Sequence, residues 1–384
     1  MENNINSAQE RGTLSEIARE FLRLGFVAFG GAAAHVAVME ERFVRRLGWL
    51  SRERFLDLFG AASLLPGPSS TELAIYLGEV RGGFAGMLIA GACFILPAAF
   101  MVVALAWAYM KFGSVPQVAG LLFGIKPVVV ALMAQAIWNL ARTALRSLPL
   151  ALLAATAVVL AAYGQPLLVL LLGGGILWVL LKQRQRMVRG QVAFTGAVGL
   201  STAAAPAMVG LVPVFLYFLK VGAVLFGSGY VLLAILRADL VVRLHWLSDN
   251  QLLDAIAVSQ GTPGPFFTVA TFIGFLLGGW RGAALATIGM FLPAFVYVAL
   301  TARVLPTLRK SPLAGAFLDG VNAAAVALMG FVGWQFARAS LVNWPAGVIA
   351  VVSAALVFQY KINSAWLVVG GAVAGILLRS AGWA

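Results

Sequence analysis

The sequence carries the motif Pro-Gly-Pro twice, at residues 66–68 and again at 263–265. Proline lacks an amide hydrogen and clashes with the preceding helical turn, so two prolines around a glycine interrupt a helix. Both copies lie in apolar surroundings typical of membrane helices, where unwound backbone is tolerated only if protein buries it or it lines a polar cavity. A helix break at corresponding positions of two halves indicates the substrate-binding site of a transporter.

Composition defines the class of protein around these motifs. Hydrophobic residues make up 61% of the 384 residues, charged residues make up 11%, and the mean hydropathy is +0.95. A soluble domain has roughly 45–50% apolar and about 25% charged residues, so the chain is a polytopic membrane protein. The net charge of +13 fits basic cytoplasmic loops that fix orientation, or alternatively an anionic substrate, rather than nucleic-acid binding. The single cysteine, Cys93, excludes a disulfide framework.

The chain is an internal duplication. Trp49-Leu50-Ser51 returns 197 positions later as Trp246-Leu247-Ser248, the same offset that separates the two Pro-Gly-Pro motifs. Beyond the motif the offset is 196, so Gly82-Gly83 corresponds to Gly278-Gly279. The repeat predicts an all-α protein of two homologous halves. Its segments are a polar N-terminal tail at 1–13, a first repeat at 14–181, a basic and then Gly/Ala/Pro-rich linker at 182–213, and a second repeat at 214–384.

Each half is expected to contain the same helices. The first helix, at 14–47, has a weak point at Phe29-Gly30-Gly31. Two short arms follow on either side of the Pro-Gly-Pro motif. Two helices long enough to cross a bilayer come next, and then a tight hairpin of shorter helices. The expected ranges are 53–65 and 69–81 for the arms, 84–111 and 118–146 for the long helices, and 149–163 and 166–181 for the hairpin.

The loop charges indicate how the halves are oriented. The loop from Glu40 to Asp57 holds five arginines, whereas its counterpart from Arg237 to Asp254 holds two. The next loop reverses the bias, with Lys111 alone in the first half against three basic residues in the second. Because basic loops stay cytoplasmic, this alternation predicts an inverted-topology repeat with about ten crossings in all.

The combined motifs resemble the chromate ion transporter family, in its long two-domain form. The likeness covers residues 15 to 384 and implies a bacterial inner-membrane protein that exports chromate from the cytoplasm, with sulfate as a mimicking oxyanion, and so confers chromate resistance. The first half departs from the Gly-Gly-Pro pattern of that family, having Ala32 after Gly30-Gly31. The motifs that carry the resemblance are Phe29-Gly30-Gly31 with His35, Trp49-Leu50-Ser51, Pro66-Gly67-Pro68 and Leu96-Pro97. Each motif has a counterpart in the second half, where Leu232 stands in place of His35.

A chromate site needs donors that replace the water around a tetrahedral dianion. A helix that begins directly after a proline break points unpaired N–H groups and a partial positive charge into the gap. We therefore expect hydroxyl and amide donors at both breaks to bind the oxyanion, although serine and threonine that only cap a kinked helix would show the same pattern. The candidates are Pro66, Gly67, Pro68, Ser69, Ser70, Thr71, Thr262, Pro263, Gly264, Pro265 and Thr268.

Further candidates surround these two breaks. Small residues at Gly30, Gly31, Gly227, Ser228 and Gly229 either line the site or allow close helix packing.

Three ionisable residues are also candidates. Lys126 lies in the apolar run 121–141, with Asn322 as its counterpart, and contacts either substrate or lipid headgroups. Glu72 is a candidate for proton coupling, or alternatively meets Arg81. His35 is a second coupling candidate, since histidine titrates near neutral pH.

Competing functions remain open at this stage. Two histidines and one cysteine offer little for a metal site or a nucleophilic enzyme, so no metal or cofactor is expected. A lipid-processing enzyme, an anion channel, and an importer or exchanger of sulfate or another oxyanion are the alternatives. The expected partners are the oxyanion and the lipid bilayer, with no nucleic acid, and a homo-oligomer stays open.

The inverted topology makes a direct prediction. Cysteines introduced at Ser114 and Pro306, which occupy corresponding loops, should react with a membrane-impermeant thiol reagent from opposite sides of the membrane. Labelling of both from one side would contradict inversion.

Overall fold

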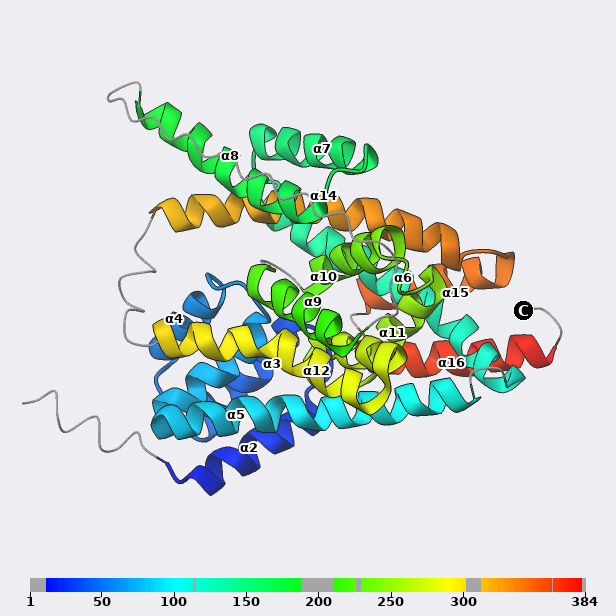
Figure 1. The fold of residues 1–384 in the computed structure, drawn as a ribbon, viewed down its shortest axis with the longest axis horizontal. Coiled ribbons are helices and arrows are strands. Elements are labelled where there is room, and N and C mark those ends of the chain that lie inside the picture. Colours follow the sequence, from blue (N-terminus) through cyan, green and yellow to red (C-terminus); the bar gives the residue numbers. More distant parts are fainter. Residues whose placement is uncertain are drawn as a thin grey trace, which may run out of the picture.

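The computed structural model describes residues 12–112, 115–187, 210–225, 229–301, 312–360 and 362–381. Ser114, Pro306, Gly227 and Ser228 lie outside these residues, as do most of the N-terminal tail and of the linker. The described regular structure is helical throughout (Figure 1), which confirms the all-helical prediction for this part of the chain.

The first half repeats in the second almost element by element. Even a π-helical segment recurs at the same offset, and Ser51 and Ser248 cap the following helices by accepting from backbone N–H groups at 3.2 Å. The first-half elements are α2 (Leu14–Val27), α3 (Ala32–Met39), η2 (Glu40–Arg46), α4 (Arg52–Ala62), α5 (Ser69–Phe112), α6 (Pro116–Ala144), α7 (Leu148–Ala162) and α8 (Leu167–Met187). The second-half elements are α9 (Leu211–Val224), α10 (Gly229–Leu236), η3 (Arg237–Arg243), α11 (Asp249–Gly261), η4 (Phe266–Thr268), α12 (Val269–Thr301), α14 (Pro312–Ser340), α15 (Trp344–Gln359) and α16 (Ser364–Ser380).

The helices α5 and α12 are each hairpins of a short and a long arm. The reversal occurs at Gly82–Gly83 in α5 and at Gly278–Gly279 in α12, where the second glycine has φ of 61° and 58°. This left-handed region favours glycine. The arms then pack so closely that a Cβ added to Gly78 would lie 2.4 Å from the carbonyl oxygen of Gly86. The division into arms at 69–81 and 84–111 therefore agrees with the sequence-based expectation.

The two halves are interleaved rather than side by side. Helix α6 of the first half packs against α15 and α16 of the second, and α14 of the second half packs against α7 and α8 of the first (Figure 1). Glycines make the first crossing close, because a Cβ on Gly124 would meet the carbonyl oxygen of Gly371. Close approach through small residues is how membrane helices gain packing contacts. The hairpin α7–α8 of the first half thus supports α14 of the second half, and the hairpin α15–α16 of the second half supports α6 of the first.

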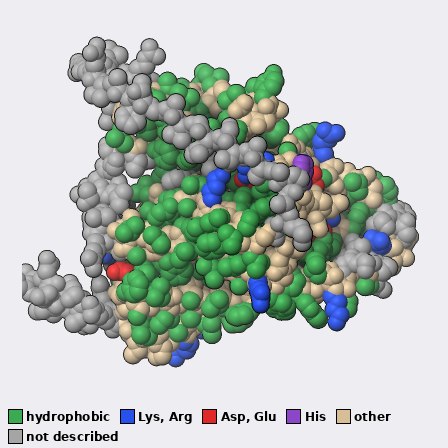
Figure 2. All heavy atoms as spheres, in the orientation of Figure 1, with side chains coloured by type: hydrophobic (Ala, Val, Ile, Leu, Met, Phe, Trp, Pro, Cys, Tyr) green, Lys and Arg blue, Asp and Glu red, His purple; other side chains and the backbone are tan. Residues whose placement is uncertain are grey.

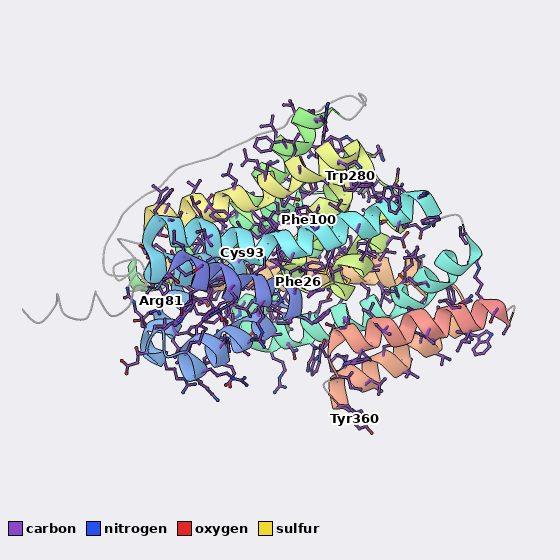
Figure 3. All side chains as sticks on the ribbon, turned by 90° about the horizontal axis from the view of Figure 1, so that it is seen from below. Phe26, Arg81, Cys93, Phe100, Trp280 and Tyr360 are labelled. Atoms are coloured by element: carbon purple, nitrogen blue, oxygen red, sulfur yellow. The ribbon has the colours of Figure 1, made fainter. Side chains whose placement is uncertain are left out.

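The surface fits a lipid environment. Four helical segments in the described part of the chain are long and apolar enough to cross a membrane: Ser69–Phe112, Gly120–Ala144, Phe266–Thr301 and Gly315–Ser340. Figure 2 shows one face that is mostly hydrophobic, with basic side chains scattered over it. Large apolar side chains such as Phe100 and Trp280, labelled in Figure 3, are 69% and 64% exposed. The protein is multi-pass, while the count of ten crossings stays a prediction.

The close contact between the arms of α5 makes a stability prediction. Gly78→Ala should destabilise the protein by about 1–3 kcal/mol, because its methyl group overlaps the Gly86 carbonyl oxygen. Gly330→Ala in α14 is the control, since a Cβ there meets nothing within 4 Å. The measurement is the melting temperature of the detergent-solubilised protein. Equal melting temperatures for the two variants would contradict the hairpin packing.

Candidate functional site

The two Pro-Gly-Pro motifs are each hydrogen-bonded to the other half of the protein. The N–H of Gly67 donates to the carbonyl oxygen of Leu225 at 2.7 Å, and that of Gly264 donates to the carbonyl oxygen of Ala28 at 2.8 Å. Ala28 and Leu225 are themselves counterparts in the repeat and end α2 and α9. The exchange is therefore reciprocal: each motif is fixed to the end of the first helix of the other half.

Glycine is required at both motifs. The φ angles of Gly67 and Gly264 are +136° and +93°, which L side chains rarely adopt. A Cβ on Gly264 would also lie 2.6 Å from the Cβ of Ala98. The prolines interrupt the helices and the glycines allow the backbones of the two halves to meet.

His35 extends this connection into the first half. Its Nε2 lies 3.2 Å from the carbonyl oxygen of Ala28, and its Nδ1 lies 3.4 Å from Oγ of Ser70. Because a carbonyl oxygen only accepts, Nε2 carries the hydrogen, and Nδ1 of the neutral ring accepts from the Ser70 hydroxyl. His35 is 1% exposed. It therefore links the break after α2, the second motif and the start of α5.

A cavity of about 40 Å³ lies where these elements meet. Several of its lining residues are repeat counterparts: Ala32 with Gly229, Ser69 with Phe266, and Ser70 with Phe267. The cavity is thus formed by equivalent parts of both halves, but the two sides differ. The first half contributes hydroxyl groups and His35, whereas the second contributes two phenylalanine rings. The remaining lining residues are Gly31, Pro68 and Gln260.

The polar side of the cavity is rich in hydrogen-bond donors. Pro68 O accepts from the N–H groups of Thr71 at 2.7 Å and Glu72 at 3.0 Å. The N–H groups of Ser69 and Ser70, at the start of α5, have no acceptor among the described residues. Gln260 is 7% exposed, and its Nε2 has no hydrogen-bond partner within the described chain. Unpaired buried donors at a helix N-terminus are suited to a small anion.

The structure separates the predicted hydroxyl residues into two groups. Ser69 and Ser70 line the cavity. Thr262 and Thr268 instead donate within their own turns, to the carbonyl oxygens of Ser259 at 3.2 Å and Pro265 at 2.9 Å. Thr71 is fully buried outside the cavity lining, and its Oγ1 has no partner among the described residues.

The predicted glycines are divided in the same way. Gly30 has φ of +105° and lets the chain turn between α2 and α3, while Gly31 and Gly229 line the cavity. Among the motif prolines, Pro68 lines the cavity and Pro66, Pro263 and Pro265 do not.

Lys126 and Asn322 lie away from this cavity. The Nζ of Lys126 is 3.1 Å from Oδ1 of Asp254 on α11, and the Tyr109 hydroxyl donates to Oδ2 of the same carboxylate at 2.9 Å. Asn322 lines a separate hollow with Arg146 and other residues near the end of α6. The structure thus does not place Lys126 or Asn322 at the cavity beside the Pro-Gly-Pro motifs.

Glu72 lies next to the site without lining it. It is fully buried, and its carboxylate oxygens have no hydrogen-bond partner in the described part of the chain. The alternative interpretation paired it with Arg81, but Arg81 lies 3.5 Å from Glu16 of α2 and over the ring of Trp49.

Four cavity residues were not among the predicted site residues: Ala32, Phe266, Phe267 and Gln260. Gln260 is the polar one. It lies at the end of α11, three residues before Pro263, and its first-half counterpart is Ser63. An amide side chain in an apolar helix directly before a proline break was a usable signal, because buried polar groups in membranes need partners.

Helices interrupted around an internal polar cavity in a multi-pass membrane protein are typical of transporters. The sequence profile of the family described as Chromate transporter matches residues 15–179 and 212–376, and the chain belongs to this family. It is accordingly a transporter and not an enzyme. In the described residues no three His, Cys, Asp or Glu side chains are grouped as a metal site requires.

Two relatives align with nearly the whole chain, and a third aligns with part of it. The chain is 31% identical to the chromate transport protein of Cupriavidus metallidurans over 375 residues, 95% of this chain and 93% of the relative. It is 31% identical to the probable chromate transport protein of Synechococcus elongatus, covering 96% of each. The uncharacterized transporter YwrA of Bacillus subtilis matches over 128 residues at 29% identity, 33% of this chain and 72% of that protein. No solved structure matches the chain.

Proposed function

We propose that this protein carries chromate out of the cytoplasm across the inner membrane of a bacterium and thereby confers chromate resistance. Two relatives that span nearly the whole chain are a chromate transport protein and a probable one. The observation that carries the proposal is the cavity between the halves, where hydroxyl, amide and backbone N–H donors converge. A tetrahedral oxyanion presents acceptors in every direction, so converging donors match it.

The binding step follows from the hydrogen-bond donors at the cavity. The N–H groups of Ser69 and Ser70 and the Nε2 of Gln260 point to oxyanion oxygens in place of water. The Ser70 hydroxyl, which donates to His35, is expected to rotate toward the anion. The rings of Phe266 and Phe267 close the opposite side and keep the site dry, which strengthens each charge-assisted hydrogen bond.

Alternating access is the expected mode of transport, with the two halves related by inversion. The reciprocal hydrogen bonds and the swapped α6 and α14 contacts indicate an approximate two-fold axis between the halves, because each contact that one half makes to the other is made again in the opposite direction. The alternating loop charges favour an axis in the membrane plane, and therefore inversion. In transporters with inverted repeats, one bundle rocks against the other around a fixed site near the bilayer midplane. The cavity, contributed by both halves, is suited to such a fixed site.

The transport activity is tested with inverted membrane vesicles. Chromate should accumulate inside them, sulfate should compete, and collapsing the membrane potential should reduce uptake. Uptake into right-side-out vesicles only would favour import of chromate or another oxyanion. Passive flux at the rate of an open pore would indicate a channel, and no flux of either anion would refute the proposal.

The site is tested with variants of the cavity donors. Gln260→Leu keeps the size of the side chain but removes its donor, and Ser70→Ala removes a hydroxyl. Each should weaken chromate binding by roughly 10-fold to 100-fold, because a hydrogen bond to a charged group contributes about 1.5–3 kcal/mol. The measurement is the dissociation constant for chromate of the purified protein in lipid nanodiscs.

Matched controls separate this effect from general damage. Gln359→Leu changes an exposed glutamine at the end of α15 and should bind chromate as the wild type does. Thr268→Val should also retain binding, since that hydroxyl donates to Pro265. Unchanged binding in both Gln260→Leu and Ser70→Ala would exclude this cavity as the substrate site.

A further inference from the structure

Glu72 is a fully buried carboxyl group that the binding step does not use. It lies on the first turn of α5, and a Cβ placed on Gly67 would lie 2.5 Å from its Oε1. This added Cβ would also lie 3.7 Å from the carbonyl oxygen of Gly222 in α9. The carboxyl group therefore lies next to the first Pro-Gly-Pro motif and close to α9 of the second half.

The surroundings of Glu72 do not compensate a negative charge. Both carboxylate oxygens are buried and without a hydrogen-bond partner in the described part of the chain. The N–H of Gly67, the nearest motif amide, is already bonded to Leu225. Burying an ionised carboxylate without a donor or a cation is far more costly than burying the neutral acid.

The ionisable groups that face Glu72 are phenols. Tyr76 lies one turn further along α5 and bonds to Thr301, and Tyr297 of α12 donates to the carbonyl oxygen of Ala223 at 2.7 Å. Several charged residues on the other helices around α5 are paired with one another. These pairs are Arg81 with Glu16 of α2, Arg42 of η2 with Glu20, Arg52 of α4 with Glu40, and Asp254 of α11 with Lys126, while His35 of α3 contacts Ser70.

We propose that Glu72 takes up a proton when the oxyanion binds, so that anion and proton occupy the site together. The inference rests on the proposed function, because the anion is placed beside Ser69 and Ser70, on the same helical turn. A dianion there and an ionised Glu72 repel each other across an interior of low dielectric. Addition of one proton from water converts the carboxylate to the neutral acid and removes this repulsion. By linkage, protonation of Glu72 strengthens anion binding to the same extent.

The second half shows that the carboxyl group is not needed for the fold. The counterpart of Glu72 is Val269, which is also fully buried at the start of α12. An apolar residue thus satisfies the same position in the repeat. A valine in one half and an unpaired carboxyl group in the other are consistent with a role for Glu72 in transport rather than in packing.

The test measures proton uptake during anion binding by the full-length protein in nanodiscs. Chromate is added in weak buffer, over a pH range in which it stays the dianion, and a pH-indicator dye reports protons taken up. At the alkaline end of this range, where Glu72 is ionised before chromate binds, the wild type should take up roughly one proton per chromate bound, and there its affinity should fall by up to about tenfold per pH unit as pH rises. Glu72→Gln should bind chromate without proton uptake and with little dependence on pH.

The controls and outcomes separate the two proposals. Glu79→Gln, on the same arm of α5 and half-buried, should take up protons as the wild type does. Chromate binding by the wild type without proton uptake at any pH in this range would overturn the role of Glu72 whether or not the variant folds. Uptake that persists in Glu72→Gln but is lost in His35→Gln would assign the proton to the histidine and overturn it as well. Failure of the wild type to bind chromate would instead overturn the proposed function.

Discussion

The exchange of two backbone hydrogen bonds between the halves is the constraint on which the rest of the structure depends. A hydrogen bond of this kind contributes only about 1 kcal/mol net, but a buried N–H left without a partner costs about 1–3 kcal/mol, and more in lipid. The breaks around Gly67 and Gly264 are therefore tolerated only where the other half supplies Leu225 O and Ala28 O. Neither half satisfies its own motif, so the site exists only when the two repeats are assembled.

This dependence agrees with the way the long helices pack. Helix α6 packs against α15 and α16, and α14 packs against α7 and α8. The helical hairpins at the end of each half therefore also pack on the opposite half, as the Pro-Gly-Pro motifs do. Motion of one half then necessarily changes the surroundings of the other half's break. A cavity at this junction is well placed to respond to the relative position of the halves, which is what alternating access requires.

The two repeats have the same backbone conformation around their helix breaks but carry different side chains there. At equivalent positions around the two breaks, the first half has Ser69 and Ser70 and the second has Phe266 and Phe267. His35 likewise corresponds to Leu232. One copy thus provides the donors and the other an apolar wall, with Gln260 as the polar contribution of the second half. Two identical polar breaks would place more unpaired donors in the membrane than a small anion can satisfy.

Much of this architecture is predictable from local sequence. Proline and glycine fix backbone geometry within a few residues, so the breaks at both motifs and the reversals at Gly82–Gly83 and Gly278–Gly279 follow from residue type and spacing. The exchange of α7–α8 with α15–α16 does not follow, because both hairpins are mostly apolar and show no helix-face pattern that selects a partner. The hydrogen-bond partners of the hydroxyl groups cannot be predicted from local sequence either. Thr71 and Thr268 are counterparts, yet whether each side chain bonds its own turn or faces a cavity depends on contacts that only the assembled halves define.

The central claim is tested most directly by a cryo-EM map of the protein in a lipid nanodisc with chromate bound. The account predicts density for one tetrahedral anion between the halves, within hydrogen-bond distance of the Ser69 and Ser70 amides and of the Gln260 side chain, with Gly67 and Gly264 still joined to the opposite half. Anion density elsewhere, or two Pro-Gly-Pro segments separated from each other and facing lipid, would contradict it.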